Sequence, residues 1–249
     1  MIRKSTIKFI QSLQQKKNRD EHKLFIAEGP KLVNELLTEG SFVCQQIFID
    51  QNSTECLTPQ NQFTYADRIE SVQDFELQKM SGFTHANKIL ALFEQRQLNT
   101  EPDLKGKISL VLDDIRDPGN LGTIIRIADW FGIENLICSL HTADPYNPKV
   151  VQGTMASLGR VKLFYKDLPA WLPKISVKKF AATLGGKPLT EINILQEAIL
   201  VIGNESFGVS EPILQCVDEN ISIPGFGKAE SLNAAVATGI ILYHFKSRG

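Results

Sequence analysis

The apolar positions of this chain follow two alternating patterns. In the second half, residues 108–112 and 198–202 are uninterrupted apolar runs, and between them residues 121–131 repeat apolar side chains three and four positions apart. Continuous runs are typical of strands buried on both faces of a parallel sheet, and the second spacing is that of an amphipathic helix. The alternation predicts a parallel sheet covered by helices.

The rest of this half repeats the pattern. Asn120 has the character of a helix cap, and Gly132 ends the predicted helix. Further strands are expected at 136–138, 161–165, 180–183 and 221–223, and further helices at 148–158, 168–173 and after Asn233.

The first half predicts a smaller α/β unit. An amphipathic helix is expected at 3–15 and a basic loop at 16–19. Strands are expected at 24–26, 42–49, 62–66 and 88–93, and helices at 31–37 and 71–80. The polar stretch 99–103 contains a proline and marks a domain boundary. The predicted organisation is a first domain at 1–98, a linker at 99–106 and a second domain at 107–249.

The final helix is apolar almost all round. Its residues include Ala235, Val236, Ile240 and Tyr243 on one stripe, while Ile241 and its neighbours fill much of the rest. Such a helix must be buried on more than one side. We therefore expect another subunit to cover it.

Composition narrows the class of protein. The net charge is −1, so bulk charge does not attract nucleic acid, although the first 31 residues are locally basic. No apolar run is long enough to span a membrane, and the N-terminus lacks the apolar core of a signal peptide. The four cysteines are scattered without metal-binding spacing, so we expect no metal and a cytoplasmic location with reduced thiols.

Three polar loops are the candidates for chemistry, because dinucleotide, P-loop and nucleophile-elbow motifs are absent. Each loop alone has an ordinary explanation as a helix cap, a surface charge or a turn. In a parallel sheet, however, the loops beyond the carboxyl ends of the strands are where ligands bind. The loops hold Asn120 with Arg126, then Gly203, Asn204, Glu205 and Gly208, then Ser231, Leu232 and Asn233.

Taken in order, these loops resemble the SpoU/TrmH family of the SPOUT superfamily, which are RNA ribose 2′-O-methyltransferases. The resemblance rests on the stretches 117–126, 202–208, and 221–224 with 231–237, and it extends over roughly residues 107–247. The stretches 14–19 and 25–29 look like the substrate-binding domain that many members carry, which is similar to small RNA-binding folds of ribosomal proteins.

The resemblance implies a fold and a cofactor. The second domain would be an α/β parallel sheet tied in a deep trefoil knot, a rare exception to the rule against threaded chains. S-adenosylmethionine would bind in the knot, and the protein would act as a homodimer through this domain, including the final helix. Its cofactor-binding residues would be Thr183, Leu184, Gly185, Gly203, Asn204, Gly208, Ile223 and Leu232.

The resemblance also implies the catalytic residues. Arg126 would activate the ribose 2′-hydroxyl or stabilise its developing charge. Its partners in the catalytic set would be Asn120, Glu205, Ser231 and Asn233. For RNA binding we expect the basic cluster of Lys16, Lys17 and Arg19 to contact phosphates.

Several alternatives stay open at this point. Large-subunit rRNA is the favoured substrate, a tRNA 2′-O-methyltransferase is the second reading, and a catalytically idle RNA-binding or ribosome-assembly factor is the third. An oxidoreductase is disfavoured because the glycine-rich fingerprint is missing. One departure from the family pattern is Ala156, which stands where relatives commonly have glycine and would slightly crowd its surroundings.

Overall fold

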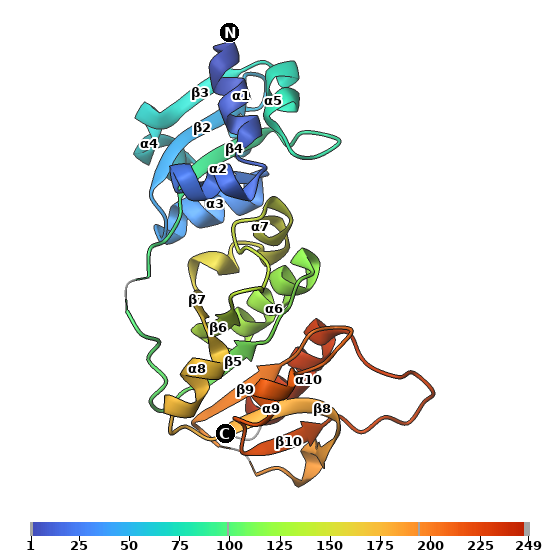
Figure 1. The fold of residues 1–249 in the computed structure, drawn as a ribbon. Helices are drawn as coiled ribbons and strands as arrows, with labels where there is room; N and C mark the ends of the chain where they lie inside the picture. The colour runs from blue at the N-terminus through green and yellow to red at the C-terminus, as the bar shows by residue number, and fades with distance from the viewer. Residues whose placement is uncertain (1, 99, 194, 247–249) are drawn as a thin grey trace. The chain divides into compact units, whose positions relative to one another are not determined.

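The computed structural model describes residues 2–98, 100–193 and 195–246, and its contacts divide the chain into two compact units (Figure 1). Unit 1 consists of Met1–Gln97 and Asp144–Arg160, and unit 2 of Leu98–Ala143 and Val161–Gly249. Unit 1 thus includes a segment from within the predicted second domain. The predicted linker at 99–106 stays a prediction.

Unit 1 is built on a four-stranded sheet of order β1-β4-β2-β3. Strands β1 and β2 run antiparallel to β4, whereas β2 and β3 run parallel. The strands are β1 (Leu24–Glu28), β2 (Cys44–Asp50), β3 (Ile69–Val72) and β4 (Ile89–Glu94). The helices are α1 (Lys4–Ser12), α2 (Lys16–His22), α3 (Pro30–Glu39), α4 (Pro59–Thr64), α5 (Asp74–Met80) and α7 (Pro148–Thr154).

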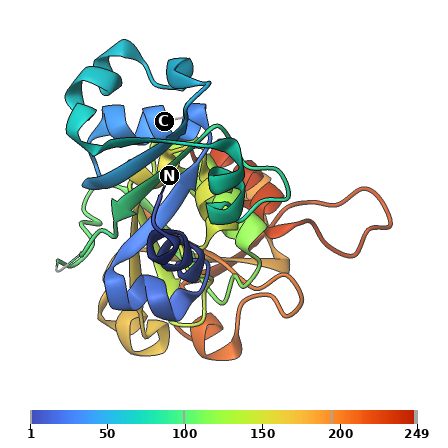
Figure 2. The same ribbon diagram turned by 90° about the horizontal axis from the view of Figure 1, so that it is seen from above.

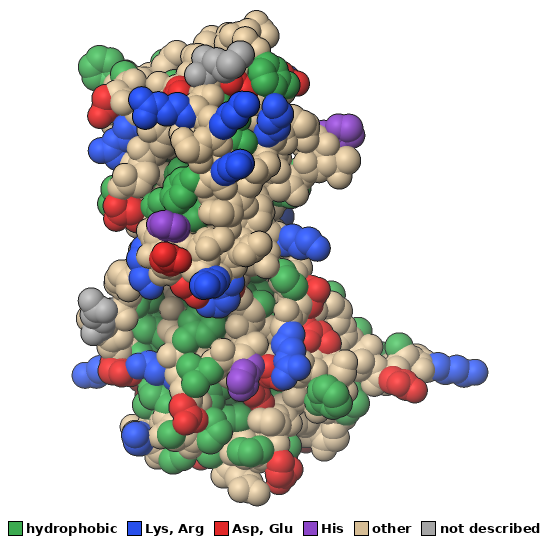
Figure 3. Space-filling model, turned by 45° about the horizontal axis from the view of Figure 1, so that its top comes forward, with side chains coloured by type: hydrophobic (Ala, Val, Ile, Leu, Met, Phe, Trp, Pro, Cys, Tyr) green, Lys and Arg blue, Asp and Glu red, His purple; other side chains and the backbone are tan. Residues whose placement is uncertain are grey.

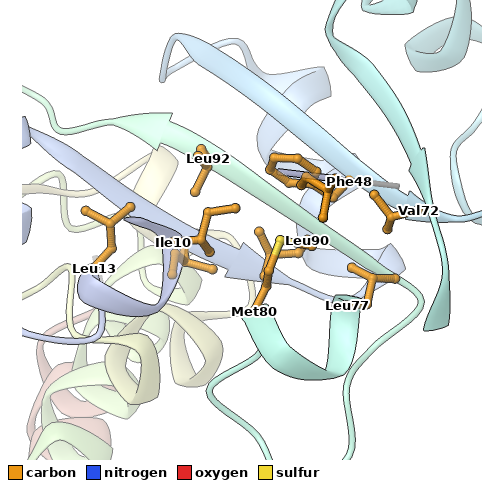
Figure 4. Close-up of a cluster of buried hydrophobic side chains, with 10 residues drawn as sticks. Ile10, Leu13, Phe48, Val72, Leu77, Met80, Leu90 and Leu92 are labelled. Atoms are coloured by element: carbon orange, nitrogen blue, oxygen red, sulfur yellow. The ribbon is translucent and has the colours of Figure 1, made fainter. Parts of the chain in front are cut away.

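Helices α1 and α5 lie side by side and share one apolar core with the sheet (Figures 2 and 4). Ile10 of α1 and Leu13, which caps the end of α1, meet Leu77 and Met80 of α5, and all four side chains are buried. They pack with Phe48 and other residues of the strands. The 3.6-residue spacing of these apolar side chains therefore explains both helices.

The segment from 144 to 160 completes the core of unit 1. The ring centroids of Phe25 and Tyr146 are 4.9 Å apart. Arg19 forms an ion pair of 2.5 Å with Asp144, and the Arg96 backbone N–H donates to the Tyr146 hydroxyl at 2.8 Å. Burial raises the pKa of Tyr146 to about 12. This buried hydroxyl is thus a neutral structural group.

Unit 2 is built on a six-stranded sheet of order β10-β8-β9-β5-β6-β7, in which each neighbouring pair is parallel. The strands are β5 (Ile108–Leu112), β6 (Asn135–Ser139), β7 (Lys162–Lys166), β8 (Lys179–Pro188), β9 (Ala198–Ile202) and β10 (Glu219–Ser222). The helices are α6 (Pro118–Trp130), α8 (Leu168–Trp171), α9 (Glu211–Leu214) and α10 (Ala234–Lys246). The predicted parallel sheet with helices is confirmed, while the knot stays a prediction.

Short 3-10 turns occur in both units. They are η1 (Thr54–Cys56), η2 (Ala66–Arg68), η3 (Ser157–Gly159), η4 (Leu172–Lys174) and η5 (Leu189–Glu191). Among the described residues, no helix is both long and apolar enough to cross a membrane.

Two local predictions in unit 1 are wrong. The strand expected at 62–66 is instead helix α4, because the Thr58 side chain accepts the Asn61 N–H and Pro59 occupies the first turn. The third strand is β3, further along the chain. The basic stretch at 16–19 is not a loop, since it forms the start of α2.

Candidate active site

The carboxyl ends of the unit 2 strands define one edge of the sheet, because neighbouring strands are parallel. Loop 113–117 leaves β5 at this edge, loop 203–210 leaves β9, and loop 223–233 leaves β10. Within β8, residues 182–186 bulge out between the pairs Ala181–Asn220 and Lys187–Ile221. All the predicted catalytic and cofactor-binding residues lie on these loops, on this bulge or on helix α6.

Helix α6 begins earlier than its apolar pattern suggests. The Asp117 carboxylate, not the Asn120 amide, caps the helix by accepting the Asn120 N–H at 2.8 Å, and Pro118 occupies the first turn. The expectation that Asn120 is the cap is therefore wrong. Its side chain is left available for contacts outside the helix.

The Asn120 side chain connects the three polar loops. Its Nδ2 donates to Glu205 Oε1 at 2.6 Å, and its Oδ1 accepts from Asn233 Nδ2 at 2.8 Å. Asn233 Oδ1 in turn accepts the N–H groups of Ala235 and Val236 and so caps α10. The hydrogen-bonded chain Glu205–Asn120–Asn233, here called the amide relay, holds side chains from the β9 loop, from helix α6 and from the β10 loop in one fixed arrangement.

The Glu205 loop is tightly closed. Asn204 and Gly208 exchange two backbone hydrogen bonds of 2.9 Å, and Asn204 Oδ1 accepts the Ser206 N–H. A Cβ on Gly203 would lie 2.1 Å from the Gly208 carbonyl carbon, so a side chain cannot fit there. The loop therefore presents Glu205 from a rigid support.

Asp114 is a feature of the site that the sequence reading missed. It has a left-handed backbone, φ +64°, which is uncommon for a residue other than glycine. Its N–H donates to Ser139 Oγ, and its carbonyl accepts from Asn204 Nδ2. Its carboxylate accepts a hydrogen bond from Arg116 Nε at 3.0 Å and forms an ion pair with Arg116 Nη2 at 2.8 Å. The Asp-Asp pair directly after an apolar run was the only signal in the sequence. Asp114 links the β5, β6 and β9 ends of the sheet.

The structure does not bring the two remaining catalytic candidates into the amide relay. Arg126 is exposed on α6 and forms no hydrogen bond or ion pair with any described residue. It lies six positions after Asn120, about 9 Å along the helix axis. Ser231 is also exposed and without a hydrogen bond to the described part of the chain.

The β8 bulge carries three of the predicted cofactor-binding residues. Thr183 Oγ1 is buried and has no hydrogen-bond partner among the described residues. A Cβ on Gly185 would meet nothing within 4 Å, so the backbone there is open to a ligand. Leu184 is 79% exposed, and Leu232 on the neighbouring loop is 48% exposed.

These features fit a nucleoside cofactor, which needs polar contacts from backbone and hydroxyl groups together with apolar contacts for its base. Gly203, Asn204 and Gly208 stand on the adjacent β9 loop, and Ile223 follows β10. Ile223 also lines a surface hollow of about 440 Å³. The other residues lining it are Leu189, Thr190, Pro224, Ile240, Tyr243 and His244.

The three predicted RNA-binding residues lie on α2 and differ in accessibility. Lys16 and Lys17 are exposed, and Lys16 pairs with Asp20 at 2.6 Å. Arg19 is only 2% exposed, because its guanidinium binds the Asp144 carboxylate and two backbone carbonyls. Arg19 is thus a buried structural residue of unit 1 in this structure.

Comparison with protein families gives a match to each part of the chain. The SpoU rRNA methylase family matches residues 107–243. The MRM3-like substrate-binding domain matches residues 4–91. The two matches leave a short stretch between them and together cover most of the chain.

Individual proteins are similar over nearly the whole chain. The 23S rRNA (guanosine(2553)-2′-O)-methyltransferase RlmP of Bacillus subtilis is 29% identical over 96% of this chain and 95% of its own. A putative RNA methyltransferase of the TrmH family from Porphyromonas gingivalis is 32% identical over all of both chains, with a TM-score of 0.86. An rRNA methyltransferase from Sinorhizobium meliloti, solved with AdoMet bound, is 30% identical over 98% and 95% of the two chains, with a TM-score of 0.85.

Proposed function

Since this chain belongs to the SpoU rRNA methylase family, we propose that it methylates a ribose 2′-hydroxyl of structured RNA, using S-adenosylmethionine. The amide relay at the carboxyl edge of a parallel sheet is the observation that carries this proposal, since it joins the three motifs of the site. Large-subunit rRNA is the proposed substrate, because rRNA methyltransferases are among the relatives that span nearly the whole chain.

The cofactor supplies an electrophilic methyl group when it is bound. The unpartnered Thr183 hydroxyl and the open backbone at Gly185 are suited to hold its polar groups. Leu184 and Leu232 expose apolar surface for the adenine ring, and both would lose that exposure on binding. The remaining proposed contacts come from the β9 loop and from Ile223.

Arg126 is proposed to act on the substrate. Its guanidinium is exposed and is not committed to a described partner, so it is free to bind an incoming phosphate or hydroxyl. A guanidinium has a pKa above about 12 and seldom loses its proton. We therefore assign to Arg126 the stabilisation of charge on the attacking 2′-oxygen or on the adjacent phosphate, which fixed donors achieve without reorganisation.

The amide relay is proposed to orient the nucleotide. Within the described part of the chain, the Glu205 carboxylate accepts one side-chain hydrogen bond, from Asn120, so it retains acceptor positions for a ribose hydroxyl. Asn120 and Asn233 hold that carboxylate in place. Ser231 stands on the same loop as Asn233 and is proposed to contact the nucleotide. Correct orientation of two reactants can supply several kcal/mol, up to about 7–11 kcal/mol, of barrier lowering.

The further proposals concern partners and location. Val236, Ile240 and Tyr243 form an exposed apolar stripe on α10, which supports a homodimer through unit 2. Lys16 and Lys17 are proposed to contact RNA phosphates, while Arg19 keeps a structural role. A cytoplasmic location accords with rRNA as the substrate.

The first experiment is transfer of a labelled methyl group from S-adenosylmethionine to unmodified rRNA and tRNA, followed by mapping of alkali-resistant ribose positions. Label at a 2′-O position of rRNA is the expected result. Label only in tRNA would replace the proposed substrate. Absence of label together with absence of cofactor binding in calorimetry would favour the idle RNA-binding reading.

Substitution of Arg126 tests its role within this reaction. Arg126→Ala is expected to lower methyl transfer by at least about 100-fold, the usual cost of a lost charge-stabilising donor, with cofactor affinity unchanged. Arg126→Lys keeps the charge but not the planar fork, so it should restore only a part of the activity. Turnover of Arg126→Ala close to that of the wild type would contradict the assignment.

A further inference from the structure

Unit 1 carries a second basic surface, formed by α1, α5 and the loop 81–88, that is separate from the lysines of α2. We propose that this surface binds the substrate RNA by contacting phosphates and stacking an unpaired base; the proposal rests on the proposed function. The surface, here called the α1–α5 face, consists of Lys4, Lys8, Phe75, Lys79 and His85.

The support beneath this face is rigid. The buried Glu76 carboxylate on α5 accepts the N–H of Ile2 and the N–H of Gln73, each at 2.9 Å. It thereby pins the start of α1 to the start of α5. On their inner sides the two helices share one core, in which Ile10 meets Leu77 (Figure 4). Side chains on the outer sides are therefore held in a fixed relation to each other.

The lysines of the two helices border one another. Lys4, Lys8 and Gln11 lie at positions i, i+4 and i+7 and share one side of α1. Gln11 Nε2 donates to the Lys79 carbonyl at 2.8 Å, which places this side of α1 against the end of α5. Lys79 therefore continues the basic stripe of α1 onto α5.

An exposed aromatic ring lies next to these cations. Phe75 is 45% exposed, and the Lys79 Nζ is 5.0 Å from its ring centroid. Proteins bind unpaired bases by stacking them on such rings, and each stacked base contributes about 1–3 kcal/mol. An aromatic ring bordered by lysines has the chemistry of a single-stranded RNA contact.

Hydrogen bonds from Gln78 and Glu28 hold the loop after α5 in place. Gln78 of α5 accepts the Ala86 N–H and donates to the carbonyl of Thr84. At the other end, the buried Glu28 carboxylate accepts the Ser81 hydroxyl at 2.6 Å and the Gly82 N–H at 3.0 Å. Thr84 and the next residue, His85, are exposed. The loop thus offers a hydroxyl and a flat ring beside the helix face.

The charge balance of the face favours a polyanion. Lys4, Lys8 and Lys79 form no ion pair with any described carboxylate, and Asp74 pairs with Lys88. The buried Glu76 carboxylate attracts Lys79 from within α5 and offsets a part of its charge, whereas Lys4 and Lys8 have no such partner among the described residues. Figure 3 shows Lys and Arg side chains gathered over unit 1 on the face that it presents. Lysines that contact phosphates displace the counterions condensed on the RNA, which is a large source of binding affinity.

The test measures binding of the full-length protein to an unmodified transcript of large-subunit rRNA at several salt concentrations. The variant is Lys4→Ala/Lys8→Ala/Lys79→Ala. Its affinity is expected to fall by at least tenfold, and its log–log salt slope should fall by about 2–3, since each phosphate contact contributes 0.7–0.9. In methyl transfer its KM for RNA should rise, while kcat and cofactor affinity stay unchanged.

A matched control has the same loss of charge in unit 2. Lys105, Lys162 and Lys174 are exposed. Lys105 and Lys174 lie before strands β5 and β8, and Lys162 is the first residue of β7, so all three are at the edge of the sheet opposite the amide relay. The triple alanine variant at these positions should bind RNA as the wild type does. Equal losses in both triple variants, or an unchanged salt slope in the first, would overturn the proposal.

The aromatic contact has its own pair of variants. Phe75→Ala should weaken RNA binding by about five- to 160-fold without a change in salt slope, as loss of one stacked base predicts. Phe63→Ala is the control, because Phe63 is 88% exposed on α4, away from this face. Unchanged affinity of Phe75→Ala would remove base stacking from the proposal.

Different experimental outcomes would contradict the proposed function and the proposed role of the α1–α5 face. If the lysine variant loses RNA affinity but the wild type methylates neither rRNA nor tRNA, the face stands and the proposed function fails. If the wild type methylates rRNA and the lysine variant keeps both its KM and its affinity, the proposed function stands and the face fails.

Discussion

A single carboxylate fixes the first residues of two helices in unit 1. Glu76 is 2% exposed, and its pKa is lowered, chiefly by the hydrogen bond from the Gln73 N–H. A folded pKa below the unfolded value means that the ionised group stabilises the fold above the unfolded pKa, about 4.3, and that this contribution disappears as pH falls through the folded pKa.

Glu76→Gln is therefore expected to lower the free energy of unfolding by about 1–3 kcal/mol at pH 7, the usual value of hydrogen bonds to a charged group. Urea unfolding at about pH 7 and about pH 3.5 measures this effect. The difference in free energy of unfolding between Glu76→Gln and the wild type should be smaller at the lower pH. Glu21→Gln, at an exposed position of α2, is the control. A difference that is constant with pH would contradict the assignment.

The roles of two single residues could not be predicted from the sequence. Lys16, Lys17 and Arg19 form one basic cluster in the sequence, and the cluster predicts phosphate contact for all three. Arg19 differs from its neighbours because its carboxylate partner, Asp144, lies 125 positions away. Local composition cannot signal a partner at that separation. Asn120 was misjudged for a local reason, since Asp117 is an equally good cap three positions earlier.

At the scale of elements, the β8 bulge separates two adjacent glycines. A Cβ on Gly186 would lie 2.5 Å from the Ile221 backbone nitrogen, whereas a Cβ on Gly185 would meet nothing within 4 Å. Gly186 is thus required by the close approach of β10, and Gly185 is not. This difference allows the fold and the cofactor contact to be tested independently.

Gly186→Ala is expected to destabilise unit 2 by about 1–3 kcal/mol, as overpacking against backbone does. Gly185→Ala should unfold like the wild type but bind S-adenosylmethionine more weakly, because the added methyl group enters the space open to the ligand. Thermal unfolding and calorimetry measure the two effects. Equal unfolding temperatures for the two variants would contradict the role of Gly186, and unchanged cofactor affinity of Gly185→Ala would remove Gly185 from the cofactor site.

The elements themselves were predictable where burial imposes a pattern. The apolar runs of β5 and β9 are recognisable in the sequence because both faces of these strands are buried. The helical spacing of α6 is recognisable because one side of this helix is buried. The segment 62–66 was mistaken for a strand because it lacks a long apolar pattern, and the cap at Thr58 decided its conformation. The amide relay could not be predicted without the strand order as well, since β9 pairs with β5 although nine other elements separate them in the chain.

At the scale of the whole molecule, the proposed homodimer depends on α10. Val236 is 51%, Ile240 39% and Tyr243 65% exposed, one above another on the helix, while its other side is buried. Ile240→Asp is expected to convert the dimer to monomers, since a charge at an apolar interface costs several kcal/mol. Sedimentation velocity at micromolar concentration checks this, with Val43→Asp in unit 1, where Val43 is 52% exposed, as the control. A persistent dimer of Ile240→Asp would place the interface elsewhere.

The composition of unit 1 from two separate chain segments has a consequence for synthesis. On the ribosome, residues up to 97 emerge well before Tyr146 and Asp144, the partners of Phe25 and Arg19. Until residues 144–160 emerge, the nascent unit exposes the ring of Phe25, and Arg19 lacks the carboxylate of Asp144. A gene fragment that ends at residue 97 would freeze the protein in that incomplete state. A transplantable form of unit 1 therefore has to carry residues 144–160 along with residues 1–97.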